Sequence, residues 1–159
     1  MGIKITNKED KTYVVLGVPH SATSFIAQSL SKNGVNMHHT SLKNYEDWDF
    51  VKINKRILRK FGDKNLALPT EEEIMSVNVE DKIKKTVEKK KGKRWGFKDP
   101  RASLTIKKYF PYLDGDVYLI CCFRKSEKIM QGRDERTNKK FIDHYNKAII
   151  SAIKEFVEL

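Results

Sequence analysis

The chain has few cysteines and no long apolar run, and each shortage excludes a class of protein. Its two cysteines, Cys121 and Cys122, are adjacent; this spacing supports neither a disulfide scaffold nor a cysteine metal site. We expect buried thiols on opposite faces of a strand. No stretch approaches the roughly 20 apolar residues of a membrane span, and the first residues, MGIKITNKEDK, lack the apolar centre of a signal peptide. These absences predict a cytoplasmic protein without a membrane span.

Charged residues, in contrast to cysteines, are abundant in this chain. The 159 residues are 33% charged and 39% hydrophobic, which predicts one domain with a small core and a heavily solvated surface. The net charge of +11 indicates an anionic partner. More than half of this net charge lies between Asp81 and Arg94, a segment with seven lysines and one arginine but two acidic residues. The part from Lys82 to Arg94 is either a contact for a polyanion or a solvated helix face followed by a basic loop.

Residues 13–30, YVVLGVPHSATSFIAQSL, predict a strand, a tight loop and a helix. The apolar β-branched run ends at Gly17, and hydroxyl residues lead into a helical pattern. The first amides of a helix have no intrahelical partner and carry the positive end of its dipole, so an anion binds well there. The hydroxyls of Ser21, Thr23 and Ser24 add donors. The alternative is an ordinary turn between a strand and a helix.

The same loop differs from a nucleotide-triphosphate loop, G-x-x-x-x-G-K-[ST]. Ala22 stands in place of the second glycine, and Thr23 stands in place of the lysine that reaches the terminal phosphates. The cationic candidate within the loop is His20. The sequence therefore argues against an ATPase, a GTPase and a small-molecule kinase.

Two later segments also place charged residues at strand ends. In RWGFKDPRASLTIKKYF, residues 94–110, the pattern predicts a short strand, Lys98 at its carboxyl end, and a helix that begins at Asp99-Pro100. Open parallel sheets bind ligands at that edge. We expect Arg101 to pair with Asp99 or with a phosphate.

The segment DVYLICCF, residues 116–123, is an apolar strand suited to the centre of a parallel sheet. It is followed by Arg124, a bidentate phosphate ligand or a surface ion-pair partner, and by a helix from about Ser126.

Other segments predict helices and connections. Helical periodicity covers residues 44–62 and 139–159. Glu46 and Asp47, near the start of the first of these segments, are either site residues or helix-terminal charges favoured by the helix dipole. Thr70 is a predicted helix cap, and the region after it fits one broken helix or two short ones. Residues 35–37 suit a short strand. The adjacent His38 and His39 lack a third metal ligand at suitable spacing and read as a loop.

Three of these motifs resemble those of sulfotransferases that use 3′-phosphoadenosine 5′-phosphosulfate (PAPS). Residues 17–24, GVPHSATS, resemble the family's 5′-phosphosulfate loop, G-x-P-[RK]-S-G-[TS]-[ST], and depart from it at His20 and Ala22. WGFKDPR is similar to a second family motif, and Tyr45-Glu46-Asp47 with Asn54 to a third. The resemblance implies a P-loop-like three-layer α/β/α domain over residues 1–159, with a central, mainly parallel sheet. It also implies a short or truncated member, because the family usually continues with a further strand and helix.

The resemblance implies a role for each matching residue. His20 and Lys98 would stabilise the leaving phosphate and Glu46 would act as the base, while Arg124 would hold the 3′-phosphate beside Gly132, which occupies the place of a family serine. The 5′-phosphosulfate would contact Pro19, His20, Ser21, Ala22, Thr23 and Ser24. The reaction is then sulfuryl transfer from PAPS to a hydroxyl or amine, with a carbohydrate among the candidate acceptors and no metal. The alternative is a nucleotide- or polyanion-binding protein without turnover.

Overall fold

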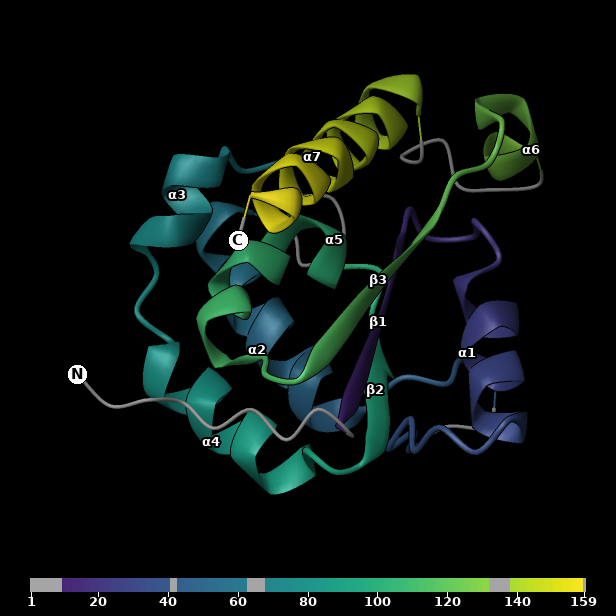
Figure 1. Ribbon diagram of the computed structural model, residues 1–159. Coiled ribbons are helices and arrows are strands. Elements are labelled where there is room, and N and C mark those ends of the chain that lie inside the picture. Colours follow the sequence, from purple (N-terminus) through teal and green to yellow (C-terminus); the bar gives the residue numbers. More distant parts are fainter. Residues whose placement is uncertain (1–9, 41–42, 63–67, 132–137, 159) are drawn as a thin grey trace.

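The computed structural model describes residues 10–40, 43–62, 68–131 and 138–158. The strands are β1 (Lys11–Gly17), β2 (Arg94–Lys98) and β3 (Asp116–Cys122). The α-helices are α1 (Thr23–Lys32), α2 (Trp48–Leu58), α3 (Glu71–Ser76), α4 (Glu80–Lys90), α5 (Ala102–Thr105), α6 (Ser126–Met130) and α7 (Lys139–Val157). Short 3₁₀ helices cover Arg59–Phe61, Ile106–Lys108 and Phe110–Tyr112. Figure 1 shows the helices around a twisted sheet.

The three strands form a parallel sheet in the order β2-β1-β3. Tyr13 of β1 lies beside Gly96 on one side and Tyr118 on the other. The predicted α/β class with a parallel sheet is therefore confirmed. A single bridge from Asn36 to Trp95 places the expected short strand of residues 35–37 against β2.

The prediction that residues 116–123 lie at the centre of the sheet is wrong. The central strand is β1, whose Val14, Val15 and Leu16 are fully buried, whereas β3 lies at an edge and its residues are exposed or half-buried. A strand that is apolar on both faces is expected to have helices above and below it. That composition does not indicate whether the strand has a neighbouring strand on each side.

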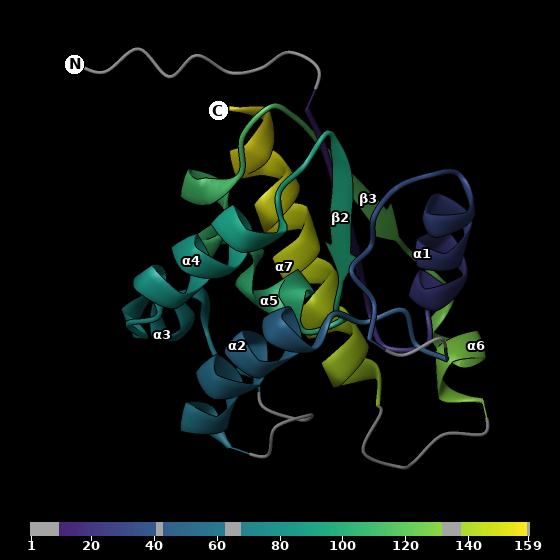
Figure 2. The same ribbon diagram turned by 90° about the horizontal axis from the view of Figure 1, so that it is seen from below.

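Helices cover both faces of the sheet, as the three-layer expectation requires. Figure 2 shows α1 and α6 on one side of the strands and α2, α3, α4, α5 and α7 on the other. The larger side holds the main core, where the rings of Phe50 and Phe97 stack at 3.9 Å between centroids and Trp95 packs beside them. A smaller cluster under α1 includes Val15, Ala27 and Met37. The carboxyl edge of the sheet, where open parallel sheets usually bind ligands, thus lies between two helical layers.

Side-chain caps mark the starts of α2, α3 and α7. Thr70 caps α3 in a capping box with Glu73, as predicted. Asp47 caps α2 by accepting the amide of Asp49 at 2.8 Å, so the helix predicted over 44–62 begins at Trp48. The predicted helix start at Asp99-Pro100 is wrong. The Asp99 carboxylate accepts a hydrogen bond from the Arg101 amide at 3.1 Å, and the Asp99 backbone carbonyl accepts one from the Ala102 amide at 2.8 Å. Residues 99–101 therefore form a turn, and α5 begins at Ala102.

The two cysteines are free and half-buried, not buried as predicted, because they lie on the edge strand. Partial burial raises the pKa of both thiols. Across the described ranges, no helix combines the length and apolarity that crossing a membrane would require.

Candidate functional site

A residue of α5 holds the end of β1, where the loop begins. The amide of Gly17 donates to Ser103 Oγ at 2.9 Å, and that hydroxyl donates to the Gly17 carbonyl at 3.1 Å. A side chain at position 17 would collide with Ser21 Oγ and lie 2.6 Å from Thr23 Cγ2. Glycine is therefore required where the loop folds back over the end of the strand.

Two residues of the loop adopt the left-handed backbone conformation. His20 has a φ of 73° and Ala22 a φ of 70°, although neither is a glycine. For a residue with a Cβ this conformation costs roughly 1–2 kcal/mol, so the loop stores strain directly before α1.

We expect Ala22→Gly to raise the stability of the protein, because glycine removes the steric cost of the left-handed angle and is the better N-cap. Allowing for the extra freedom of glycine in the unfolded chain, the gain is about 0.5 kcal/mol, or roughly 1–2 °C in Tm. Thermal melts followed by circular dichroism measure it. The matched control is Ala27→Gly within α1, which should lower Tm by removing a good helix former. Equal losses in both variants would contradict the strain at Ala22.

The start of α1 presents donors for an anion. The first amides of a helix lack a partner one turn back; here those of Phe25 and Ile26 donate to the Ala22 carbonyl, and those of Thr23 and Ser24 precede them. The N-cap residue Ala22 makes no side-chain cap bond. The hydroxyl oxygen of Ser21, a residue that is 4% exposed, is buried and makes no hydrogen bond to the described residues. A buried hydroxyl without a partner is costly. These donors suit the oxygens of a phosphate or a sulfate.

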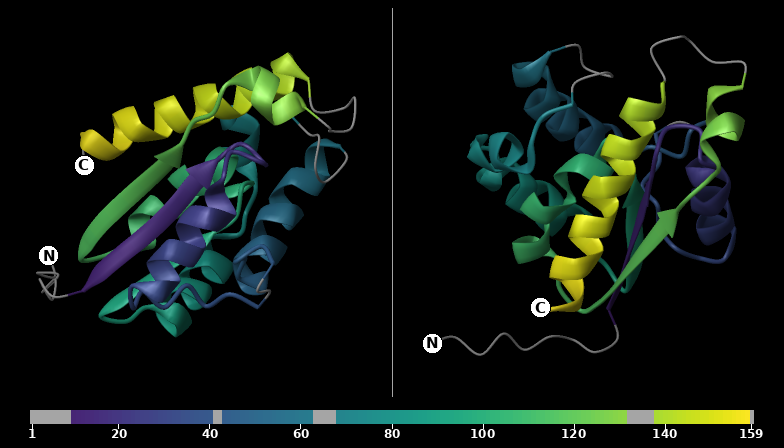
Figure 3. Two further views of the ribbon diagram at one scale, coloured as in Figure 1. Left: turned by 90° about the vertical axis from the view of Figure 1, so that its right-hand side faces the viewer. Right: turned by 90° about the horizontal axis from the view of Figure 1, so that it is seen from above.

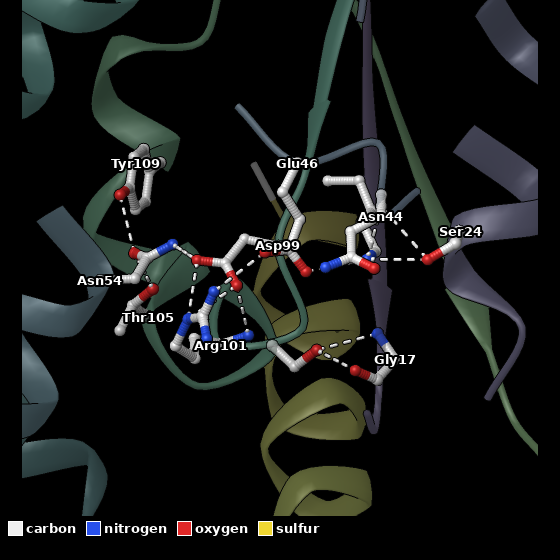
Figure 4. Close-up of polar contacts among 11 residues, drawn as sticks. Gly17, Ser24, Asn44, Glu46, Asn54, Asp99, Arg101, Thr105 and Tyr109 are labelled. Atoms are coloured by element: carbon white, nitrogen blue, oxygen red, sulfur yellow. Dashed lines mark hydrogen bonds and ion pairs between the residues drawn. The ribbon is translucent and has the colours of Figure 1, made fainter. Parts of the chain in front are cut away.

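Lys98 joins this loop to the rest of the site. Its side chain is 3% exposed, and its ammonium donates to Ser24 Oγ at 3.2 Å, to the Asn44 carbonyl at 3.0 Å and to Glu46 Oε1 at 3.1 Å. Figure 4 shows Ser24 of α1 close to Asn44 and Glu46, which both come from the loop before α2. The predicted residues Ser24, Glu46 and Lys98 therefore form one cluster beside the start of α1.

Glu46 is held on both carboxylate oxygens. Lys98 binds Oε1, and Arg101 Nη2 donates to Oε2 at 3.2 Å. The alternative for the acidic pair, a helix-terminal charge, applies to Asp47, which caps α2. Glu46 contacts the two cations instead. Its side chain is 18% exposed, so the carboxylate lies on the solvent side of the cluster.

A buried polar network supports Arg101 from behind (Figure 4). Asp99, which is fully buried, accepts from the Arg101 guanidinium at 2.9 Å and from Asn54 Nδ2 at 2.9 Å. The Asn54 carbonyl oxygen in turn accepts the hydroxyls of Thr105 at 2.7 Å and Tyr109 at 2.8 Å. Burial raises the pKa of Asp99, and the charge of Arg101 opposes that rise. The network fixes the guanidinium that holds Glu46.

Arg124 lies beside the loop. Its Nη1 donates to the His20 carbonyl at 3.2 Å, and the residue is exposed, so its guanidinium retains donors for a second anionic group. The predicted loop residues and Arg124 are thus brought to one side of the molecule. The remaining predicted contact, Gly132, lies outside the described residues.

The basic segment is partly neutralised within the chain. Lys90 pairs with Asp47 at 2.7 Å, Lys89 with Asp49 at 3.5 Å and Lys91 with Asp114 at 3.5 Å. The exposed residues Lys82, Lys84 and Lys85 lie on α4. These ion pairs favour the solvated-face alternative over a polyanion contact for the end of α4.

A separate cavity of about 220 Å³ lies between α3, α5 and α7. Its lining includes Ile74, Leu104, His144 and Ala152. Burial lowers the pKa of His144. Of the predicted site residues, none lines it, so the cavity is distinct from the cluster around Lys98.

The roles of Ser103, Asn44 and the partners of Asn54 were not predicted, because each of these residues makes its contacts with residues far away in the sequence. Within the described ranges, no three His, Cys, Asp or Glu side chains gather as metal ligands, and the expectation of a metal-free reaction stays a prediction. A scan against protein-family models, a search of curated proteins and a search of solved structures each found no match to this chain.

Proposed function

We propose that this protein is a sulfotransferase on a P-loop-like three-layer α/β/α fold, which moves a sulfuryl group from PAPS to a hydroxyl or amine. The observation that carries the proposal is the cluster of Ser24, Lys98 and Glu46 at the start of α1. The cluster supports the proposal because it holds a cation and a carboxylate next to helix amides, the groups that the transfer of a charged group requires.

The chemistry assigns a role to each group. The acceptor oxygen or nitrogen attacks sulfur and forms the new bond while Glu46 takes the acceptor's proton. The bond between sulfur and the bridging oxygen breaks, and its electron pair remains on the 5′-phosphate. Lys98, His20 and the α1 amides stabilise that negative charge. The products are the sulfated acceptor and adenosine 3′,5′-bisphosphate.

Arg124 fits the other end of the donor. Its contact with the His20 carbonyl keeps the guanidinium close to the 5′ loop, so one nucleotide can reach both. We propose that Arg124 binds the 3′-phosphate in bidentate fashion, while Ser21, Thr23 and Ser24 bind the 5′-phosphosulfate together with the amides at the start of α1.

We expect adenosine 3′,5′-bisphosphate to raise the Tm of the protein, because a ligand that binds the folded state stabilises it by RT ln(1 + [L]/Kd), about 2.7 kcal/mol at 100 times Kd. Differential scanning fluorimetry measures the shift. Adenosine 5′-monophosphate is the matched ligand without a 3′-phosphate and should give a smaller shift. Arg124→Gln should reduce the bisphosphate shift to that of the monophosphate. A shift with ATP and none with millimolar bisphosphate would contradict the donor assignment.

The strained Ala22 and the histidine in place of a loop lysine or arginine favour a second candidate, a nucleotide-binding protein without turnover. Both candidates predict bisphosphate binding. Transfer of labelled sulfate from PAPS to acceptors that carry hydroxyls or amines, including polysaccharides, separates them. Retention on heparin that is lost when Lys82, Lys84 and Lys85 become glutamine would instead support the polyanion alternative.

A further inference from the structure

The outer edge of β3 has the composition of a strand with neighbours on both sides. Residues 117–123, VYLICCF, contain no charged residue, proline or glycine, the devices that usually protect an edge from pairing. Tyr118 is 43% exposed and Phe123 53%. Figure 1 shows β3 crossing in front of the other strands, and both views of Figure 3 show it at the border of the sheet.

The other edge of the sheet is treated differently. Asn36 donates to the Arg94 carbonyl at 2.9 Å and accepts the Gly96 amide at 3.0 Å, so part of β2 already has a neighbour on its outer side. Among the described residues, β3 has β1 as its one paired strand. The unprotected edge is therefore a specific feature of β3.

The direction of the backbone groups follows from one hydrogen bond. The Asp116 amide donates to the Asp10 carbonyl at 2.9 Å, so Asp116 faces the central strand. Since backbone groups alternate along a strand, those of Tyr118, Ile120 and Cys122 also face β1. The amides and carbonyls of Val117, Leu119 and Cys121 face outward, where they can form a second ladder.

The charges at the two ends of β3 select the partner and its direction. The strand begins at the exposed acid Asp116 and is followed by the exposed cations Arg124 and Lys125. An antiparallel copy of the same strand places the acid of each chain near the cations of the other, whereas a parallel copy would bring like charges together. A two-fold axis satisfies both chains with one surface.

From the outward backbone groups, the apolar faces and the opposite end charges, we infer that β3 pairs with β3 of a second copy of this chain in antiparallel fashion, which joins two sheets into one. A seven-residue strand makes a small contact compared with the roughly 1,600 Å² of a standard interface, so the dimer dissociates on dilution. The inference does not rest on the proposed sulfuryl transfer, although the two share Arg124.

Light scattering after size exclusion tests the assembly. The expected mass at high protein concentration is twice the 18.5 kDa of the chain. Leu119→Pro should give the monomer, because its ring removes an outward amide that β1 does not use. Leu119→Ala is the control, since it shortens the side chain and keeps the amide, and it should remain dimeric. A wild type that is monomeric at every concentration, or a dimer unaffected by Leu119→Pro, would overturn the inference.

Amide hydrogen exchange on the wild type decides the same question without a variant. In the dimer, Val117, Leu119 and Cys121 should be protected about as well as Tyr118 and Ile120, and their protection should fall on dilution. Fast exchange at the three outward amides under dimeric conditions would place the interface elsewhere. Protection in a monomer would show that the chain covers its own edge, and this result would also overturn the second-copy partner.

Discussion

Glu46→Gln is expected to reduce sulfuryl transfer at least about 100-fold, the usual contribution of a positioned general base. The same variant should bind adenosine 3′,5′-bisphosphate a few-fold more tightly than the wild type. The carboxylate pairs with Lys98 at 3.1 Å and Arg101 at 3.2 Å, so it would compete with a bound anion for both cations. A neutral amide competes less and does not repel the anion. Initial rates with PAPS and titration calorimetry with the bisphosphate measure the two effects.

The matched control is Glu88→Gln, which makes the same chemical change at an exposed position on α4. It should alter neither rate nor affinity. If Glu46→Gln retains activity within a few-fold of the wild type, another group takes the proton. If it lowers bisphosphate affinity, the cluster around Lys98 is not the anion site. The opposite directions of the two effects separate a base from a residue that merely maintains the fold.

Asp99→Ala is expected to destabilise the protein by about 3 kcal/mol, which corresponds to a loss of roughly 6–12 °C in Tm. The carboxylate is fully buried and accepts from both Arg101 and Asn54. Alanine leaves the Asn54 amide and part of the guanidinium without acceptors inside the core, and the desolvation of those groups is then uncompensated. Urea unfolding measures the change in free energy.

Asp114→Ala provides the comparison for this loss. Its carboxylate is 33% exposed and pairs with Lys91 at 3.5 Å, so its removal should cost less than about 1 kcal/mol. Equal losses at the two positions would show that the buried network contributes no more than a surface ion pair.

Features with short-range causes could be predicted from the sequence. The start of α3 follows from Thr70 and Glu73, which satisfy each other's backbone within one turn. The strand, loop and helix of residues 13–30 follow from an apolar run that stops at Gly17. The positions of Lys98 and Arg124 at strand ends follow from the same reasoning, because the carboxyl ends of parallel strands share one edge.

Features set by distant partners could not be predicted. The position of β3 at the edge depends on which strands pair with β1. The residue pattern of a single strand does not indicate its neighbours. Ser103 lies 86 residues from Gly17, the residue it binds, and the approach of Asn54 to Asp99 spans 45 residues. The late start of α5 came from a side chain that competes for its own backbone amides. These contacts decide how firmly the candidate site is held.

The double hydrogen bond between Ser103 and Gly17 has a consequence for ligand entry. These bonds fasten the base of the loop to α5, so we expect its main chain to act as a fixed receptor and not as a hinged flap. A nucleotide bound as proposed would then enter by rotation of exposed cationic side chains such as Arg124. Association should then be limited by diffusion and electrostatic attraction, with no slow rearrangement ahead of it.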